Sequence, residues 1–444
     1  MTTSTALLGP RPSPRAPFGS RARRGPGALL AALALVLAAA APAAAQPLQR
    51  RPGAPQDDAA AQRLLDLLGP DHFVREAWRA VVRRPWDAKA IDRAKFEAAR
   101  AEAVAAAQAS RTPREVRAAI NAMLGTLGVS HLAVLERAVW ERELAQEFVA
   151  RRTLRFGCEL IELDGRLFLD GVAHDGPAAR AGLRAGDEVA TIEGAPALGS
   201  PWLDPAAHDP GMPGPPGHFL RPDGERPLTL GVRRAADGPL EGVSVTPFPT
   251  SLVDAARASV RVERVGDAKV GVVRLWHFMH MDVARTVARA LEGPFVGADA
   301  VVLDLRGRGG SSAVVEAVLA LFVGRRARWR GPVVCLTDAG TRSAKEIFAW
   351  RWRQAGRGPI VGERTQGACI GCVFQELSDG SIIMLPVQDV RRMTGGESLE
   401  GKGVDPTHPV AQLPLPYRAG RDAILDAGLA EAARLAEAAT LEVH

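Results

Sequence analysis

Residues 300–310, with the sequence AVVLDLRGRGG, indicate the fold class most directly. The run Ala300 to Leu305 is apolar except at Asp304, a pattern typical of a strand buried on both faces. Glycines follow at Gly307, Gly309 and Gly310, where they let backbone N–H groups approach a ligand closely, as a phosphate loop or an oxyanion hole requires. The Gly-Lys-Ser/Thr ending of a nucleotide P-loop is absent. Taken alone, the stretch predicts a buried strand that ends in a tight turn.

Apolar strands and amphipathic helices alternate around this stretch. The expected strands are Val270 to Leu275, Ala300 to Leu305 and Pro332 to Leu336. The expected helices are Asp282 to Leu291, Ala313 to Val323, Ser343 to Ala355 and, at the end of the chain, Ala423 to Ala438. Such alternation predicts an α/β layer, and sites in α/β folds tend to lie just beyond the strands.

The chain before this layer has two different textures. Residues from about 60 to 150 have apolar positions at helical spacing, and Thr112-Pro113 predicts the start of one helix. Residues from about 153 to 250 have short β-rich runs separated by Gly and Asp turns. Within them, residues 199–226 are rich in Pro and Gly, which predicts a surface loop of ill-defined shape.

The positive charge of the chain is concentrated at its start. The 444 residues carry a formal net charge of +6, and the five arginines of residues 1–45, a segment without Asp or Glu, account for all but one unit of it. An apolar run from Ala28 to Ala41 precedes the small residues around Ala45, which is the pattern of a cleaved export signal. The run is too short to span a bilayer. We therefore expect a periplasmic or secreted protein without a stable membrane anchor, and composition gives no support for a nucleic-acid partner.

Three further clusters carry polar residues in suggestive places. They are GTRSAKEI at residues 340–347, GERTQGA at 362–368 and LEGKGVDP at 399–406. Ser343 falls at the start of an expected helix after a strand. A serine there is usually only an N-cap, but helix-terminal N–H groups can also stabilise an oxyanion beside a nucleophile.

In order and spacing, these clusters resemble the C-terminal-processing and tricorn-type serine peptidases over about residues 100–415. The resemblance implies an α/β catalytic core of the ClpP/crotonase type, with Ser343 as nucleophile. Two positions depart from the family pattern. Arg308 stands where Asn is usual, and Ala368 stands where the C-terminal-processing branch has its catalytic Lys.

Without that Lys, the serine needs another base, and imidazole is best suited near neutral pH. The tricorn-like branch has its catalytic His in a Ser-His pair before an inserted PDZ domain, and Ser130-His131 matches in motif and place. By this resemblance Glu400 orients His131 and Ser130 assists. The implied oxyanion hole comprises Ala344 with Gly309 or Gly310.

Residues 175–189 resemble the second half of a PDZ domain, a module that binds chain ends by adding the peptide as a strand. The implied carboxylate-binding loop is Gly157, Cys158, Glu159 and Leu160. The expected organisation is a signal peptide (1–45), a helical N-terminal region with the Ser-His motif (46–152), a PDZ domain (153–252), an α/β peptidase core (253–420) and a C-terminal helix (421–444).

The sequence thus predicts an exported serine endopeptidase that acts through an acyl-enzyme, with a polypeptide substrate that the PDZ domain engages by its end. No cofactor or metal is expected. One alternative is an inactive relative that binds peptide or lipid. Another is redox or metal chemistry at Cys369 and Cys372, for which a local disulfide or two packed thiols is the simpler interpretation.

Overall fold

The computed structural model describes residues 58–87, 91–206, 209–212 and 214–441. The predicted signal peptide, residues 1–45, lies outside these ranges, so it stays a prediction. Among the helices within them, none has the length and apolar character needed to cross a membrane.

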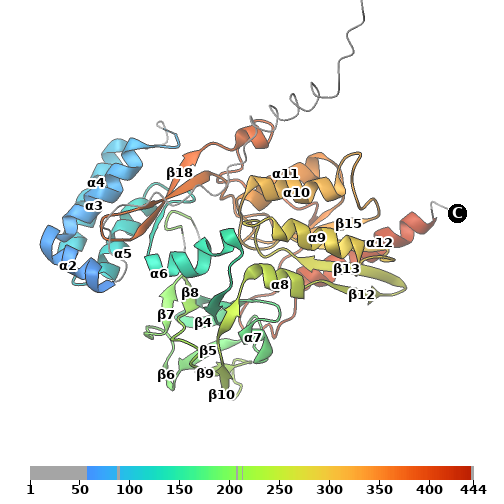
Figure 1. Ribbon diagram of the computed structural model, residues 1–444, viewed down its shortest axis with the longest axis horizontal. Coiled ribbons are helices and arrows are strands. Elements are labelled where there is room, and N and C mark those ends of the chain that lie inside the picture. The colour runs from blue at the N-terminus through green and yellow to red at the C-terminus, as the bar shows by residue number, and fades with distance from the viewer. Residues whose placement is uncertain (1–57, 88–90, 207–208, 213, 442–444) are drawn as a thin grey trace, which may run out of the picture. The chain divides into compact units, whose positions relative to one another are not determined.

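The core of the molecule is a six-stranded sheet (Figure 1). Its strands, in spatial order, are β12 (Arg261–Val265), β13 (Ala268–Arg274), β14 (Ala300–Asp304), β15 (Val333–Thr337), β16 (Ile360–Gly362) and β19 (His408–Pro409). All neighbours pair in parallel except β12 and β13, which form an antiparallel pair at one edge. The carboxyl ends of the parallel strands therefore meet along one edge of the sheet.

Side-chain alternation along these strands supplies two apolar faces. Val301 and Leu303 pack with one set of helices: α8 (Leu252–Ala258), α9 (Asp282–Glu292), α10 (Ser312–Phe322) and α11 (Ala344–Gln354). Val302 and Val334 face the long C-terminal helix α12 (Ala423–Leu441) on the opposite side. A sheet buried on both faces requires strands that are apolar throughout. The predicted α/β layer is confirmed.

The N-terminal helices cover a smaller antiparallel sheet. The helices are α2 (Asp58–Leu68), α3 (Pro70–Arg83), α4 (Arg93–Ala109) and α5 (Pro113–Gly125). They share an apolar core with β1 (Ala133–Leu135) and β18 (Ile382–Gln388), and β18 also pairs with β17 (Gly371–Glu376). The early helices are thus packed on strands from late in the chain, and this packing fixes the segment between α5 and β1.

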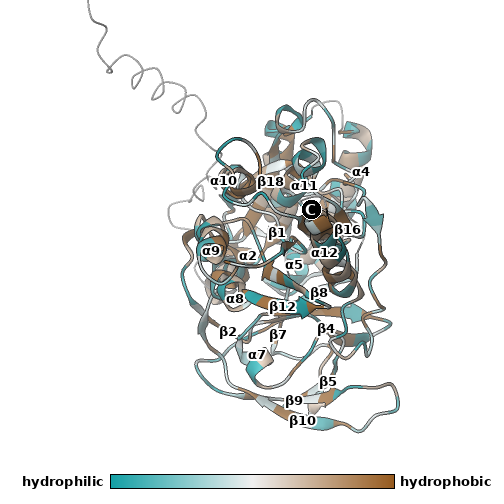
Figure 2. Cartoon of the chain, turned by 90° about the vertical axis from the view of Figure 1, so that its right-hand side faces the viewer, coloured by the Kyte–Doolittle hydropathy of each residue, from teal (hydrophilic) through white to brown (hydrophobic). Residues whose placement is uncertain are grey.

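The β-rich region forms a sheet with the strand order β10-β9-β5-β4-β3-β8-β7, and β6 pairs with β5 beside this path. Its strands are β3 (Cys158–Leu163), β4 (Arg166–Val172), β5 (Glu188–Ile192), β6 (Ala195–Pro196), β7 (Leu203–Pro205), β8 (Gly217–Leu220), β9 (Leu228–Arg233) and β10 (Glu241–Val245), with the short helix α7 (Pro177–Arg180). A separate pair, β2 (Thr153–Arg155) with β11 (Phe248–Thr250), joins the region to the core. Figure 2 shows polar and apolar residues alternating along β12 at the nearby edge of the core sheet.

The Pro/Gly-rich segment 199–226 differs from its prediction. It contains the strands β7 and β8, and β8 pairs with β3. Short apolar runs such as Phe219–Leu220 form strands here despite the surrounding Pro and Gly, because β3 offers an edge for pairing. The expectation of an ill-defined loop across the whole segment is therefore wrong.

Candidate active site

Ser343 lies at the amino end of α11, after the loop that follows β15. Its backbone has φ 60° and ψ −125°, a conformation that residues with a β-carbon rarely adopt. The side-chain Oγ lies 3.1 Å from His131 Nε2. Backbone strain of this kind is typical of functional positions. The hydroxyl therefore lies within hydrogen-bonding distance of a base.

His131 lies on the short segment between α5 and β1. The capping box of Thr112 and Glu115 starts α5, which ends at Gly125. His131 itself has φ 57°, and only 7% of its surface is exposed. Tertiary packing of α5 and β1 thus brings together a histidine and a serine that are 212 residues apart in the sequence.

Ser130 connects His131 to Glu400. Glu400 Oε1 accepts a hydrogen bond from Ser130 N at 2.8 Å, and its Oε2 accepts one from Ser130 Oγ at 2.9 Å. Ser130 Oγ also lies 2.8 Å from His131 Nδ1. Since the single hydroxyl proton is donated to the carboxylate, Nδ1 must donate to Ser130 Oγ. Nε2 then carries the lone pair that faces Ser343, which is the tautomer a general base requires.

The connection from Glu400 to His131 is indirect. The resemblance implied that Glu400 orients the histidine, with Ser130 assisting. In the structure Ser130 provides the contact with Nδ1, and Cys369 N donates to Glu400 Oε2 at 2.6 Å. The carboxylate is thus held by backbone groups on both sides, and it acts on the imidazole through one hydroxyl.

Burial and a nearby cation keep the imidazole neutral. Desolvation, followed by the positive charge of Arg342, lowers the pKa of His131 from 6.5 to about 4, while the carboxylate of Asp209 opposes this shift. A histidine with this pKa is unprotonated throughout the neutral range. It is therefore ready to accept a proton.

Asp209 is a site residue that sequence reasoning missed. Its Oδ2 accepts a hydrogen bond from His131 N at 2.9 Å and forms an ion pair with Arg342, the neighbour of Ser343. Although burial opposes it, the charges of Arg342 and His131 hold the pKa of Asp209 below its usual value. Asp209 belongs to the segment 199–226. The only signal for it was an isolated carboxylate among Pro and Gly residues, which matches no motif.

The glycines after β14 lie against the nucleophile. A β-carbon at Gly309 would be 3.0 Å from Ser343 Oγ and 2.4 Å from its Cβ, so only glycine fits there. A β-carbon at Gly310 would be 2.1 Å from the carbonyl carbon of Phe278. Within the described residues, the N–H groups of Gly309, Gly310 and Ala344 have no backbone hydrogen-bond acceptor. Gly309 thus contacts Ser343, Ala344 follows Ser343 in the chain, and Gly310 follows Gly309.

Glu346 ties the nucleophile to the segment 362–368. This buried carboxylate accepts hydrogen bonds from Ser343 N at 2.9 Å, Thr365 Oγ1 at 2.7 Å, Gly367 N at 2.7 Å and Ala368 N at 2.9 Å. Four donors on one carboxylate fix the loop against the first turn of α11. These contacts account for Thr365 and Gly367 within the segment.

Neither Ala368, at the position of the family's catalytic Lys, nor the nearby Lys345 supplies a base to Ser343. Ala368 is buried, and its carbonyl accepts a hydrogen bond from Ser343 N at 2.9 Å. Lys345 Nζ donates to the carbonyl of Arg306 at 3.1 Å, and burial lowers the pKa of this amine to about 7. The base in contact with the hydroxyl is His131.

Arg308, which replaces the usual Asn, connects the core to the β-rich region. Its guanidinium donates to the carbonyl of Glu143 at 3.1 Å and to Glu159 Oε1 at 2.6 Å, and it lies 5.1 Å from the ring centroid of Phe219. The side chain therefore points away from Ser343, so the departure from the family pattern leaves the nucleophile's surroundings open.

The implied carboxylate-binding loop leads into β3, whose edge pairs with β8. Along β3, Glu159 pairs with Phe219 of β8 and Leu160 with His218, while β4 occupies the other side. Cys158 and Leu160 are buried, and Gly157 has φ 69°. The chain's own strand β8 thus occupies the edge of β3 from Glu159 onward, while Gly157 and Cys158 precede this pairing. The carboxylate-binding role of Gly157, Cys158, Glu159 and Leu160 stays a prediction.

The four cysteines, Cys158, Cys335, Cys369 and Cys372, are free thiols. Burial raises the pKa of Cys372 to about 12, and it also raises that of Cys369 well above its ordinary value. Thiols that stay protonated are poor nucleophiles and metal ligands. Among the residues described, no cluster of three or more metal-ligating side chains occurs.

Comparison with known proteins agrees with the motifs. Residues 313–410 match the model of peptidase family S41. Tricorn protease homolog 2 of Streptomyces coelicolor is 27% identical over 361 residues, covering 73% of this chain and 28% of that protein. The carboxy-terminal processing protease CtpB of Bacillus subtilis is 26% identical over 324 residues, covering 66% of this chain and 62% of that protein.

A solved structure shares the fold. The photosystem II D1 C-terminal processing protease has a TM-score of 0.50 at 22% identity, covering 80% of this chain and 98% of that one. This chain spans less than two thirds of the length of the two curated relatives. Tricorn protease homologues and C-terminal processing proteases are thus homologues of this chain, as the motifs predicted, and they support a serine-type peptidase hydrolase.

Proposed function

We propose that this chain is a serine endopeptidase in which Ser343 is the nucleophile and His131 the general base. The observation that carries the proposal is the 3.1 Å contact between Ser343 Oγ and His131 Nε2, with Nδ1 engaged by Ser130. This arrangement supplies a nucleophile, a base in the correct tautomer and a group that fixes the base.

In the acylation step, Ser343 Oγ attacks the carbonyl carbon of the scissile peptide bond while its proton passes to His131 Nε2. Glu400 stabilises the resulting imidazolium through Ser130, which keeps the ring in place. The N–H of Ala344, with that of Gly309 or Gly310, stabilises the developing oxyanion. When the tetrahedral intermediate collapses, the C–N bond breaks and Nε2 returns the proton to the leaving amine.

In the deacylation step, water replaces the amine. His131 Nε2 removes a proton from a water molecule as its oxygen attacks the ester carbonyl, and the same donors stabilise the oxyanion. The C–Oγ bond then breaks, and Nε2 returns the proton to Ser343. Each step of this reaction uses only the peptide substrate, the chain's own residues and water.

Two finer features belong to the same proposal. Residues 1–45 direct export to the periplasm or beyond and are removed near Ala45, on the pattern of a charged start, an apolar run and small residues. Residues 153–252 form a PDZ-type module, supported by the motif at 175–189 and by the strand order of its sheet. In this module β8 occupies the edge of β3.

The test is labelling of purified full-length protein with a fluorophosphonate, which reacts only with an activated serine. Wild type is expected to label, and Ser343→Ala and His131→Gln are expected not to. Ser311→Ala is the matched control, because Ser311 caps α10 and does not contact His131. A wild-type protein that folds, as judged by circular dichroism, but does not label would contradict the proposal and favour a binding relative without activity.

A further inference from the structure

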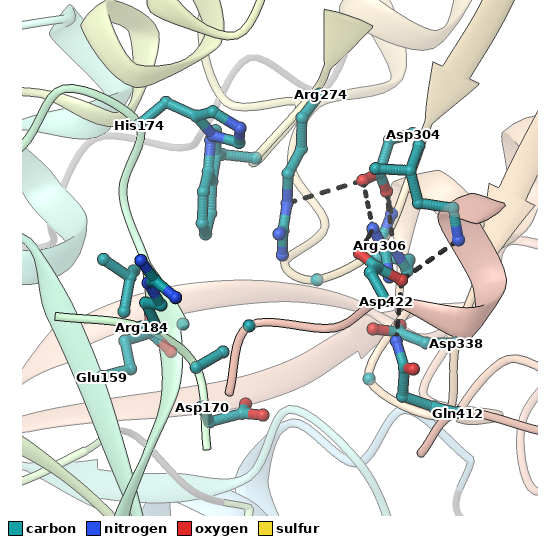
Figure 3. Close-up of a pocket in the computed structure, with 18 of the residues that line it drawn as sticks. Glu159, Asp170, His174, Arg184, Arg274, Asp304, Arg306, Asp338, Gln412 and Asp422 are labelled. Carbon is teal, nitrogen blue, oxygen red and sulfur yellow. Dashed lines mark hydrogen bonds and ion pairs between the residues drawn. The ribbon is translucent and has the colours of Figure 1, made fainter. Parts of the chain in front are cut away.

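A large polar cavity borders the candidate active site. It has a volume of about 720 Å³ and lies between the β-rich region and the carboxyl ends of β13, β14 and β15 (Figure 3). Gly307 and Arg308 line it and lead directly to Gly309, while Gly340 lines it three residues before Ser343. A ligand in this cavity would therefore lie next to both loops that form the candidate site.

Three of the arginines that line the cavity already have carboxylate partners. Arg306 is the most firmly held, since it donates to Asp304 at 2.6 and 2.9 Å and to Asp422 at 2.7 Å. Arg308 donates to Glu159, and Arg261 to Glu263. These groups form the fixed wall of the cavity.

Four other arginines of the lining donate no hydrogen bond from their side chains to any residue in the described part of the chain. They are Arg184, Arg274, Arg418 and Arg421. Arg274 projects into the cavity between His174 and the Arg306 cluster (Figure 3). It forms a long ion pair with Asp304, whose Oδ2 lies 3.8 Å from Nε, and its guanidinium lies 3.8 Å from the ring centroid of Trp276.

Buried nitrogen atoms without acceptors gather around the same space. Arg274 Nε, Arg418 Nε, His174 Nδ1 and Trp276 Nε1 are all buried, and no partner is found for them among the described residues. All four residues line the cavity. Because unsatisfied buried polar groups are uncommon and costly, the three obligate donors among them, Arg274 Nε, Arg418 Nε and Trp276 Nε1, indicate a ligand that brings acceptors.

Carboxylates also line the cavity and balance most of its positive charge. Asp338 accepts a hydrogen bond from Thr341, and Glu363 accepts from Ala339 and Gln412. Burial and the negative charges of Glu159 and Asp338 raise the pKa of Asp170 to about 6, although the positive charges of Arg418 and Arg274 oppose this shift. By count, the seven arginines of the lining exceed its six carboxylates by one.

We propose that this cavity binds a carboxylate of the polypeptide substrate, with Arg274 and Arg418 as its main ligands. The inference rests on the proposed peptidase function and deepens it. Guanidinium and carboxylate form paired, charge-assisted hydrogen bonds, which suits a carboxylate better than a neutral group. Since β8 occupies the edge of β3 from Glu159 onward, the cavity offers an anchor for the substrate besides the loop at Gly157 to Leu160.

The carboxylate has two sources, the free end of a chain or an Asp or Glu side chain. Binding is measured by fluorescence anisotropy to full-length Ser343→Ala, so that no cleavage occurs. The probes are four fluorescein-labelled hexapeptides of Ala and Leu: one with a free C-terminal acid, its C-terminal amide, and amides with one internal Glu or one internal Gln. Tighter binding of the C-terminal acid than of its amide identifies the free end of a chain as the ligand. Tighter binding of the Glu peptide than of the Gln peptide identifies an acidic side chain.

At least one carboxylate probe is expected to bind tenfold or more tightly than its neutral counterpart, and Arg274→Gln or Arg418→Gln is expected to abolish that preference. Arg434→Gln is the matched control, because this exposed arginine of α12 pairs with Glu431 away from the cavity. Should Arg274→Gln fail to fold, Arg418→Gln and the exposed Arg421→Gln carry the test.

Equal binding of all four probes, or a preference that survives Arg274→Gln and Arg418→Gln as it survives Arg434→Gln, would overturn the proposal. The result is independent of catalysis. A carboxylate preference in a protein whose Ser343 does not label with fluorophosphonate would refute the peptidase and leave a carboxylate-binding site. Labelling without a preference would do the reverse.

Discussion

The candidate active site and the arginine-lined cavity are neighbours at one edge of the core sheet, but they differ in whether their polar groups have hydrogen-bond partners. Around Ser343, the side chains of His131, Ser130 and Glu400 each have a hydrogen-bond partner in a continuous chain. In the cavity, Arg274 and Arg418 have buried nitrogen atoms with none. Groups that perform chemistry are held in place before the substrate arrives, whereas groups that bind it keep their hydrogen-bonding capacity for the ligand.

The largest expected effect tests the hydrogen-bonded chain around Ser343. We expect His131→Ala to lower kcat on the order of 10⁴- to 10⁶-fold, because the chain from Ser343 to Glu400 then lacks its proton acceptor. The measurement is hydrolysis of a fluorogenic peptide by full-length protein. Ser343→Ala should lose as much, and the double variant no more than either, since the two residues act as one unit. Additive losses would show that they act separately.

A β-carbon beside the nucleophile is the next most damaging change. Gly309→Ala places a methyl group 2.4 Å from Ser343 Cβ, so either the serine or the glycine loop must move. We expect a loss of about 100- to 1,000-fold in kcat, the usual cost of one oxyanion donor. Gly242→Ala in β10 is the control, because its nearest neighbour would be 3.9 Å away. Similar activity in the two variants would remove Gly309 from the site.

The third largest expected effect concerns Asp209, which the segment 199–226 places beside His131. Asp209→Ala removes the acceptor for His131 N and leaves the buried cation of Arg342 without its partner. We expect kcat/KM to fall about 10- to 100-fold and thermal stability to fall as well, since breaking a buried ion pair costs about 3–5 kcal/mol. Asp209→Asn should recover part of the activity, because its amide oxygen can still accept from the His131 backbone.

Asp204→Asn separates this role from general support of the segment. Asp204 is equally buried and pairs with Arg142 and Arg221, but it does not touch His131. It should lower the melting temperature with little change in the fluorophosphonate labelling rate of the folded protein. Equal effects of Asp204→Asn and Asp209→Asn on that rate would show that Asp209 has no particular role in positioning His131.

How far the sequence predicted these features depends on whether the information was local. The buried strand at 300–304 and the helix that begins after Ser343 were predicted to within a residue or two, because apolar runs and glycine positions determine them directly. The family resemblance indicated Ser343, His131 and Glu400, and the structure brings them into one hydrogen-bonded chain. Their meeting could not be derived from spacing alone, since it depends on α5 and β1 packing against β18.

The features that the sequence missed all depend on long-range pairing. Strand β8 forms because β3 offers an edge more than fifty residues earlier, and a Pro/Gly-rich composition concealed it. Asp209 gained its role only through contact with His131 and Arg342, two residues on separate elements. That Arg274 Nε and Arg418 Nε are buried without a hydrogen-bond partner is likewise invisible in a sequence that contains so many arginines, because it depends on where each acceptor lies.

The smallest expected effect tests the electrostatics of the active site. Because burial and Arg342 lower the pKa of His131 to about 4, the base should stay neutral, and kcat/KM should stay level, as pH falls through 6.5. Activity is expected to be lost only near pH 4, where Nε2 gains a proton and can no longer accept one from Ser343.

Two variants should move this acid limb in opposite directions. Arg342→Gln removes a cation that opposes protonation of His131, so the limb should move to higher pH. Asp209→Asn removes an anion that favours protonation of His131, so the limb should move to lower pH. The measurement is a pH profile of kcat/KM for each variant. Arg274→Gln, in the cavity, is the control and should leave the acid limb in place. An acid limb near 6.5 in wild type would mean that His131 is solvated, and the tight chain from Ser343 to Glu400 would not describe the working enzyme.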